Sequence, residues 1–185
     1  MRYKILILLI LWTTSVFAQK SDALDDVLRF VPMATTYTLK LAKVDSRSDW
    51  KELLVSTATT VVVCCGTTFA LKYIIKKDRP DGSDNHSFPS GHTSFVFASA
   101  HQLHKEFGKV SPWISVGGYA VAAFVGVDRI VRERHDWVDV TVGAAIGIAS
   151  TEFGYWLGEK IIGKKKKKDM ALSVSGNQVY FAMNF

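Results

Sequence analysis

Cysteine is scarce in this sequence: 185 residues contain two, Cys64 and Cys65, and they are adjacent. A vicinal pair rarely forms a disulfide because the closed ring is strained. Both residues lie inside an apolar run, where free cysteines behave as small hydrophobic side chains. We therefore do not expect disulfides to hold this fold together.

Recognisable metal-binding and nucleic-acid-binding motifs are also missing. No cysteine or carboxylate completes a ligand set around the five histidines, so we predict no metal ion and no other cofactor. The formal net charge of +6 arises partly from five lysines at 164–168, directly after an apolar segment. Such a run is more typical of a membrane-flanking segment, and we expect no nucleic-acid partner.

The sequence contains long runs without charge instead. Leu53 to Leu71 has nineteen uncharged residues, which as a helix would be about 28 Å long, close to the thickness of a bilayer core. Ser111 to Val127 is a second uncharged run, and Val140 to Leu157 carries a single charge. In that last run Gly143 and Gly147 stand four residues apart, a spacing that lets two helices approach closely.

Residues 1–18 have the pattern of a secretory signal. Arg2 and Lys4 form a basic start, Ile5 to Trp12 is apolar, and the chain reaches a small residue, Ala18, at a suitable cleavage position. We expect either a cleaved signal peptide or an uncleaved N-terminal anchor helix. Both would deliver the chain to or through a membrane, and we expect a bacterial cell envelope.

Five segments could cross a membrane in alternating directions: 24–43, 53–71, 93–107, 111–127 and 139–161. If residue 19 lies outside, this order places the non-catalytic lysine clusters on the inner side, in agreement with the positive-inside rule. We therefore predict an all-α bundle of five or six helices over residues 19–163, embedded in the inner (cytoplasmic) membrane. A soluble periplasmic all-α enzyme is the alternative.

Residues 164–185 form a separate basic run and C-terminal tail. Alternating apolar residues, Leu172 and Val174 before a Ser-Gly-Asn-Gln stretch and Val179 and Phe181 after it, predict a short C-terminal β-hairpin.

Polar residues that could handle a phosphate stand in three clusters between residues 72 and 139. The clusters are Lys72 with Arg79-Pro80, then Pro89-Ser90-Gly91-His92, then Arg129 with His135 and Asp139. A phosphoryl group in transfer spreads its charge over its equatorial oxygens, so catalysis consists mostly of positioning and electrostatic stabilisation. Cations, imidazoles, a carboxylate and a hydroxyl together suit phosphate binding and its transfer through a histidine.

The second and third clusters each predict a local arrangement. Ser90 or its neighbours would cap a helix from Thr93 onward, so that backbone N–H groups face a bound anion, and Gly91 would allow close approach. His135 and Asp139 stand four residues apart, so on a helix they share a face. The carboxylate could then hold the imidazole in one tautomer and stabilise its cation.

In this order and with these internal spacings, the clusters resemble the signature of the type 2 phosphatidic acid phosphatase (PAP2) and vanadium haloperoxidase superfamily. The matching motifs are Lys72-x6-Arg79-Pro80, Pro89-Ser90-Gly91-His92 and Arg129-x5-His135-x3-Asp139, within about residues 53 to 160. The resemblance implies that His135 is the nucleophile, that Asp139 orients it and that His92 is the general acid. It also implies a set of phosphate-binding residues: Lys72, Arg79, Ser90, Gly91 and Arg129.

One residue departs from the family pattern. Asp128 stands before Arg129, where the family usually has serine. Its carboxylate could weaken anion binding, or it could orient Arg129.

The sequence therefore predicts a metal-independent phosphatase of the bacterial envelope with a periplasm-facing active site. The expected substrate is a lipid phosphomonoester or diphosphate: phosphatidate, phosphatidylglycerophosphate, undecaprenyl diphosphate or lipid A. A soluble periplasmic non-specific acid phosphatase or a haloperoxidase-like enzyme is one alternative. A non-catalytic membrane scaffold that retains the motifs is an alternative of another class.

Overall fold

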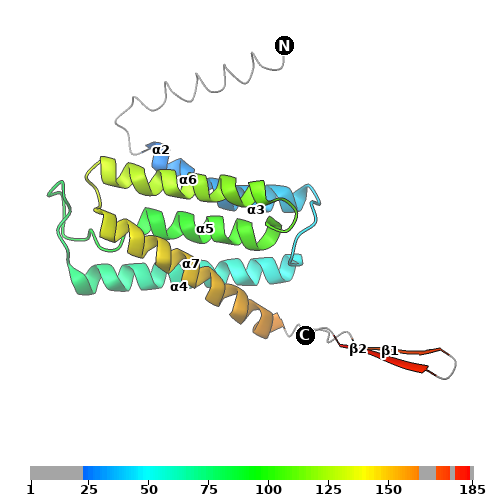
Figure 1. The fold of residues 1–185 in the computed structure, drawn as a ribbon. Helices are drawn as coiled ribbons and strands as arrows, with labels where there is room; N and C mark the ends of the chain where they lie inside the picture. The colour runs from blue at the N-terminus through cyan, green and yellow to red at the C-terminus, as the bar shows by residue number, and fades with distance from the viewer. Residues whose placement is uncertain (1–22, 163–169, 176–177, 184–185) are drawn as a thin grey trace, which may run out of the picture.

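The computed structural model of the chain describes residues 23–162, 170–175 and 178–183 (Figure 1). The helices, in chain order, are α2 (Ala23–Leu28), α3 (Val31–Leu41), α4 (Trp50–Ile75), α5 (Gly91–Phe107), α6 (Pro112–Val131) and α7 (Trp137–Ile162). The predicted all-α bundle is confirmed for this part of the chain. The predicted signal peptide or anchor at residues 1–18 lies outside the described residues.

Helix α5 is the centre of the bundle. Helices α3, α4, α6 and α7 all pack against it, and α7 also packs along α4 (Figure 1). Val96 and Ala100 of α5 meet Ala122 and Val125 of α6 in a fully buried apolar cluster. This contact fixes α5 against α6 and, with the contacts to α4 and α7, holds the beginning of α5 in place.

Glycines let α7 lie directly on its neighbours. A Cβ added at Gly143 would lie 2.7 Å from the carbonyl oxygen of Ser90, and one at Gly147 would collide with the backbone of Ser94 in α5. Gly154 makes the same kind of contact with the backbone of α4. The close helix contact predicted for Gly143 and Gly147 is therefore confirmed.

Hydrogen-bonded caps fix where α5 and α7 begin. Ser90 is the N-cap of α5, as predicted, and its side chain accepts a hydrogen bond from the backbone N–H of Thr93. At the start of α7, Asp136 accepts from the backbone N–H of Asp139 at 3.0 Å, and Asp139 accepts from that of Asp136 at 3.1 Å. This reciprocal pair is a capping box. It places the side chain of Asp139 at the helix start.

The expected span at 24–43 is not one helix. It divides into α2 and α3, which are separated at Arg29 and Phe30. Pro32 lies in the first turn of α3, where a missing N–H does no harm because those N–H groups have no partner within the helix. With 11 residues, α3 is too short to cross a bilayer.

Two of the described helices, α4 and α6, are long and apolar enough to cross a membrane by length and composition. Helix α4 contains the expected span 53–71, and α6 contains the expected span 111–127 except for Ser111, which is its N-cap. The expected spans 93–107 and 139–161 form α5 and α7, which do not meet the same measure. Helix α5 has 17 residues and carries charged side chains near its end.

The strands β1 (Met170–Ser175) and β2 (Gln178–Met183) pair antiparallel, with Met170 opposite Met183. Residues 163–169 and 176–177, which connect β1 to α7 and to β2, lie outside the described residues. The expected C-terminal hairpin therefore stays a prediction.

Candidate active site

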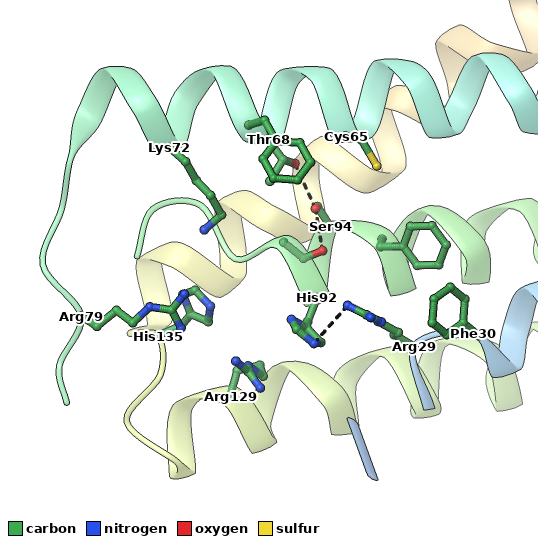
Figure 2. A pocket seen from close by; sticks show the side chains of 13 residues that line it. Arg29, Phe30, Cys65, Thr68, Lys72, Arg79, His92, Ser94, Arg129 and His135 are labelled. Carbon is green, nitrogen blue, oxygen red and sulfur yellow. Dashed lines mark hydrogen bonds between the residues drawn. The ribbon is translucent and has the colours of Figure 1, made fainter. Parts of the chain in front are cut away.

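The three sequence clusters meet at one end of the bundle. There α4 and α6 end, while α5 and α7 begin (Figure 1). A cavity of about 410 Å³ opens between these helix ends. Its charged and titratable lining residues are Arg29, Lys72, Arg79, His92, Arg129 and His135, and Phe30, Cys65, Phe69 and Phe95 supply apolar walls (Figure 2). Figure 2 shows Arg79 and His135 at one side of the cavity and Phe30 at the other.

Six of the eight predicted site residues line this cavity: Lys72, Arg79, Gly91, His92, Arg129 and His135. The other two, Ser90 and Asp139, are fully buried. The backbone N–H of Ser90 donates to the carbonyl oxygen of Asp139 at 3.0 Å, which joins the second cluster to the third. The structure thus brings all eight residues together, and their chemical roles stay predictions.

His135 and Asp139 form a buried pair, with 2% and 0% of their side chains exposed. Nδ1 of His135 lies 3.6 Å from Oδ2 of Asp139. The hydroxyl of Ser87 donates to the same carboxylate oxygen and lies 3.5 Å from Nδ1. Because Nδ1 is turned toward the carboxylate, Nε2 is the ring nitrogen that can meet a substrate in the cavity.

The surroundings of His135 favour its neutral form. Burial lowers the pKa of this imidazole, and the charges of Lys72, Arg79 and Arg129 lower it further, while Asp139 opposes them. The imidazole is therefore uncharged near neutral pH, with a lone pair available for attack.

Lys77 belongs to this site, although the sequence analysis did not single it out. Its ammonium donates to Oδ1 of Asp139 at 2.8 Å and also forms an ion pair with Asp136. Burial lowers the pKa of Lys77, but hydrogen bonds to the two carboxylates outweigh it and the net shift is upward. A cationic Lys77 offsets the cost of burying the charge of Asp139.

His92 contacts residues near the beginning of the described chain. Its Nε2 lies 2.8 Å from Oδ1 of Asp26 and 3.2 Å from Nη1 of Arg29 (Figure 2 shows the Arg29 contact). Arg29 and Asp26 also pair with each other at 3.4 Å. Burial lowers the pKa of His92, and the hydrogen bond to Asp26 opposes that shift.

Arg129 is held by a second carboxylate of α2. It is buried and forms an ion pair with Asp25, which is fully buried. Asp128, the residue that departs from the family pattern, forms an ion pair with Arg132 one turn later, at 2.8 Å. The charge of Asp128 is thus compensated by Arg132, and Asp25 holds the guanidinium of Arg129 in the cavity wall.

Residues of the loop between α4 and α5 accept hydrogen bonds from the other two cations of the site. Nζ of Lys72 donates to the carbonyl oxygen of His86 at 2.7 Å, and Nε of Arg79 donates to Oδ1 of Asp84 at 2.8 Å. These contacts leave both side chains in the lining of the cavity. Lys72, Arg79 and Arg129 therefore surround one space with positive charge, which suits a bound phosphate.

The sequence reasoning missed five residues at this site: Asp25, Asp26, Arg29, Lys77 and Ser87. For the first three a signal existed, because they are charged residues at or near the start of a segment expected to cross a membrane. Ionisable residues in such a segment are functional candidates by default. A lone lysine and a lone serine in a polar loop carry no comparable signal.

Comparisons with known proteins give a family. The sequence profile of the PAP2 superfamily matches residues 50–162. The lipid A 1-phosphatase of Porphyromonas gingivalis is 42% identical over 139 residues, which are 75% of this chain and 31% of that protein. The probable diacylglycerol pyrophosphate phosphatase 1 of Schizosaccharomyces pombe is 38% identical over an alignment of 74 residues that covers 34% of this chain and 26% of that protein. The chain spans about a third of the length of the curated relatives it matches.

A solved structure shares the fold. The crystal structure of Aquifex aeolicus LpxE superposes with a TM-score of 0.55 at 22% sequence identity, over 74% of this chain and 88% of that one. The bundle of this chain is therefore a known arrangement of helices.

Proposed function

The chain belongs to the PAP2 superfamily, and we propose that it is a phosphatase that removes phosphate from a membrane lipid through a phosphohistidine at His135. One observation carries the proposal. A neutral His135, backed by Asp139, adjoins a cavity whose wall holds the cations Lys72, Arg79 and Arg129.

Two displacements at phosphorus would complete the reaction. Nε2 of His135 attacks, and a P–N bond forms as the bond to the leaving oxygen breaks, while His92 gives its proton to that oxygen. A water molecule then attacks phosphorus and returns a proton to His92. The P–N bond breaks, and phosphate and neutral His135 are released. The three cations hold the equatorial oxygens in both steps.

The apolar half of the cavity favours a lipid substrate. Phe30 and Phe95 meet edge to face, with ring centroids 5.2 Å apart, and they share the cavity with the phosphate-binding cations. A substrate with a phosphate head and apolar chains matches this division of the lining. Phosphatidate, phosphatidylglycerophosphate, undecaprenyl diphosphate and lipid A are the candidates. Lipid A comes first because of the 42% identity to a lipid A 1-phosphatase.

The outer surface of the bundle supports a location in a bilayer. Trp113 at the start of α6 and Trp137 at the start of α7 are 78% and 70% exposed. Trp137 and Trp156 stand about 28 Å apart along α7, which is near the thickness of a bilayer core, and tryptophans gather at both membrane interfaces. We therefore propose that the bundle is embedded in the inner membrane of a bacterial envelope.

The charges at the two ends of the bundle support an orientation. Basic residues lie in the last or first turns of the helices at the end remote from the cavity, or in the connections between them: Lys40, Lys43, Arg47, Lys51, Lys105 and Lys109. Connections rich in lysine and arginine stay on the cytoplasmic side. The cavity at the other end would then face the periplasm.

Phosphate release by the purified protein in detergent, with EDTA present, tests the proposal. The substrates are lipid A, phosphatidate, phosphatidylglycerophosphate, undecaprenyl diphosphate and a small soluble ester. We expect release from at least one lipid and none from His135→Ala, with Asp45→Asn, an exposed residue far from the motifs, as the matched control.

Two other results would each replace the proposal. Release from the soluble ester alone would indicate a non-specific acid phosphatase. Phosphate binding without turnover of any substrate would indicate a non-catalytic scaffold.

A further inference from the structure

Helix α2 precedes the part of the chain that matches the family. The match begins at residue 50, whereas α2 ends at Leu28. Even so, the two carboxylates of α2, Asp25 and Asp26, reach Arg129 and His92 in the cavity wall. The active site of this chain is therefore built in part from a segment that lies outside the family match.

The contacts of His92 determine which of its ring nitrogens can act on a substrate. Asp26 and Arg29 both lie within hydrogen-bond distance of Nε2. The carboxylate accepts a hydrogen bond from Nε2–H, whereas the guanidinium could donate only to an unprotonated Nε2, so the tautomer decides which contact is a hydrogen bond. With the proton on Nε2, the ring donates to Asp26 whether or not Nδ1 is protonated, and Nδ1 is left to face the leaving oxygen.

We propose that α2 is an active-site element and that Asp26 is the positioning residue of the general acid His92. The site then has two carboxylate–histidine pairs, Asp139 with the nucleophile His135 and Asp26 with His92. This inference rests on the proposed function. As the P–O bond breaks, Nδ1 of His92 gives its proton to the leaving oxygen, and Asp26 gains no proton. In the second step the attacking water returns a proton to Nδ1.

The charges around His92 explain why such a partner is needed. The groups that face this ring are Asp25 and Asp26 from α2, Arg29 after it and Arg129 from α6, and Lys72, Arg79 and His135 share the cavity. Most of these groups are cations, which together with burial disfavour a protonated imidazole. A carboxylate 2.8 Å from Nε2 opposes them and limits the net downward shift of the pKa of His92.

Steady-state kinetics over a range of pH test the inference, using the lipid phosphate that the wild type hydrolyses. The variants are Asp26→Asn, Asp26→Glu and the exposed control Asp45→Asn. We expect Asp26→Asn to lower kcat about ten- to a hundredfold, because losing the positioning residue removes part of the rate enhancement that a general acid contributes. KM should change little because the interaction acts in the transition state. Asp26→Glu should recover part of the loss.

The pH profile separates positioning from a structural role. His92 must be protonated to act, so it sets the alkaline limb of kcat/KM. Loss of the carboxylate lowers the pKa of His92, and the limb should move to lower pH. The carboxylate of Asp26 is half exposed, so solvent screens the pair and we expect a shift of about half a unit to one unit.

Two kinetic results would overturn the inference. A fall in kcat with an unmoved alkaline limb would mean that Asp26 only supports the fold. A rise in kcat/KM in Asp26→Asn would mean that the carboxylate occupies the site and competes with substrate.

A titration by NMR makes the inference independent of turnover. The imidazole of His92, assigned with the variant His92→Gln in histidine-labelled protein, should titrate at lower pH in Asp26→Asn than in the wild type. Equal titration would overturn the inference even if the protein is a phosphatase. Absence of phosphatase activity in the wild type would instead refute the proposed function, and the titration would still decide whether Asp26 acts on His92.

Discussion

Replacing Gly143 by alanine should disturb the active site through packing alone. A Cβ at this position would lie 2.7 Å from the carbonyl oxygen of Ser90 and 3.3 Å from Cβ of Thr93, whereas ordinary contacts are 3.4–4 Å. Both atoms belong to the start of α5, which carries His92. The backbone of Ser90 cannot rotate away as a flexible side chain could, so α5 and α7 must move apart.

The magnitude follows from two opposing effects. Overpacking of this kind costs about 1–3 kcal/mol, and alanine returns up to about 1 kcal/mol because it favours the helix more than glycine does. We expect a net loss of about 1–2 kcal/mol, which for a domain of this size lowers Tm by about 2–8 °C. A displacement of His92 from its position against the phosphate should lower kcat by about tenfold or more.

Gly117→Ala in α6 is the matched control. A Cβ there meets no atom within 4 Å, and the residue is exposed. The same chemical change should therefore leave turnover unchanged and raise stability by up to about 1 kcal/mol. Thermal unfolding in detergent and phosphate release measure both quantities. Equal Tm and equal kcat in the two variants would refute the packing argument.

Three further predictions concern the chemistry. Asp139→Asn should lower kcat by about a hundredfold to ten-thousandfold, because an amide cannot hold the imidazole of His135 in the reactive tautomer or stabilise its cation. A loss of less than about tenfold in steady-state kinetics would contradict this. Arg79→Gln should move the acid limb of kcat/KM to higher pH. Arg79 is among the charges that lower the pKa of His135, so its removal raises that pKa, and the nucleophile must be neutral to attack. An acid limb that stays in place or moves to lower pH would contradict this. Phosphate release should be unchanged by EDTA, because Lys72, Arg79 and Arg129 supply the positive charge of the site; activity lost to the chelator and restored by a divalent cation would contradict this.

The motif spacings predicted the parts of the site that depend on local structure. Ser90 caps α5 because a hydroxyl before a helix satisfies a free N–H group, and this can be recognised in the sequence. His135 and Asp139 come together because the chain turns into α7 between them. The close approach at Gly143 was likewise predictable, because small residues four positions apart mark a helix contact.

The parts that depend on long-range contacts could not be predicted in the same way. Asp25 meets Arg129 across 104 positions of sequence, and Asp26 meets His92 across 66. The docking of α2 on the bundle determines which residues these two carboxylates contact. From the sequence we expected one continuous membrane span over residues 24–43, and so we placed no separate helix at the active site. Pro32 and the charged residues before it indicated a break that a count of apolar residues does not show.

The central claim is a covalent intermediate on His135, and trapping it is the most direct test. The purified protein would be mixed with the lipid phosphate that it hydrolyses, labelled with ³²P, and quenched in alkali within a single turnover. The account predicts an acid-labile, alkali-stable phosphoryl group on the peptide that contains His135, present in the wild type and absent from His135→Ala. Turnover without this adduct, with inversion at phosphorus, would mean that water attacks directly and would contradict the account.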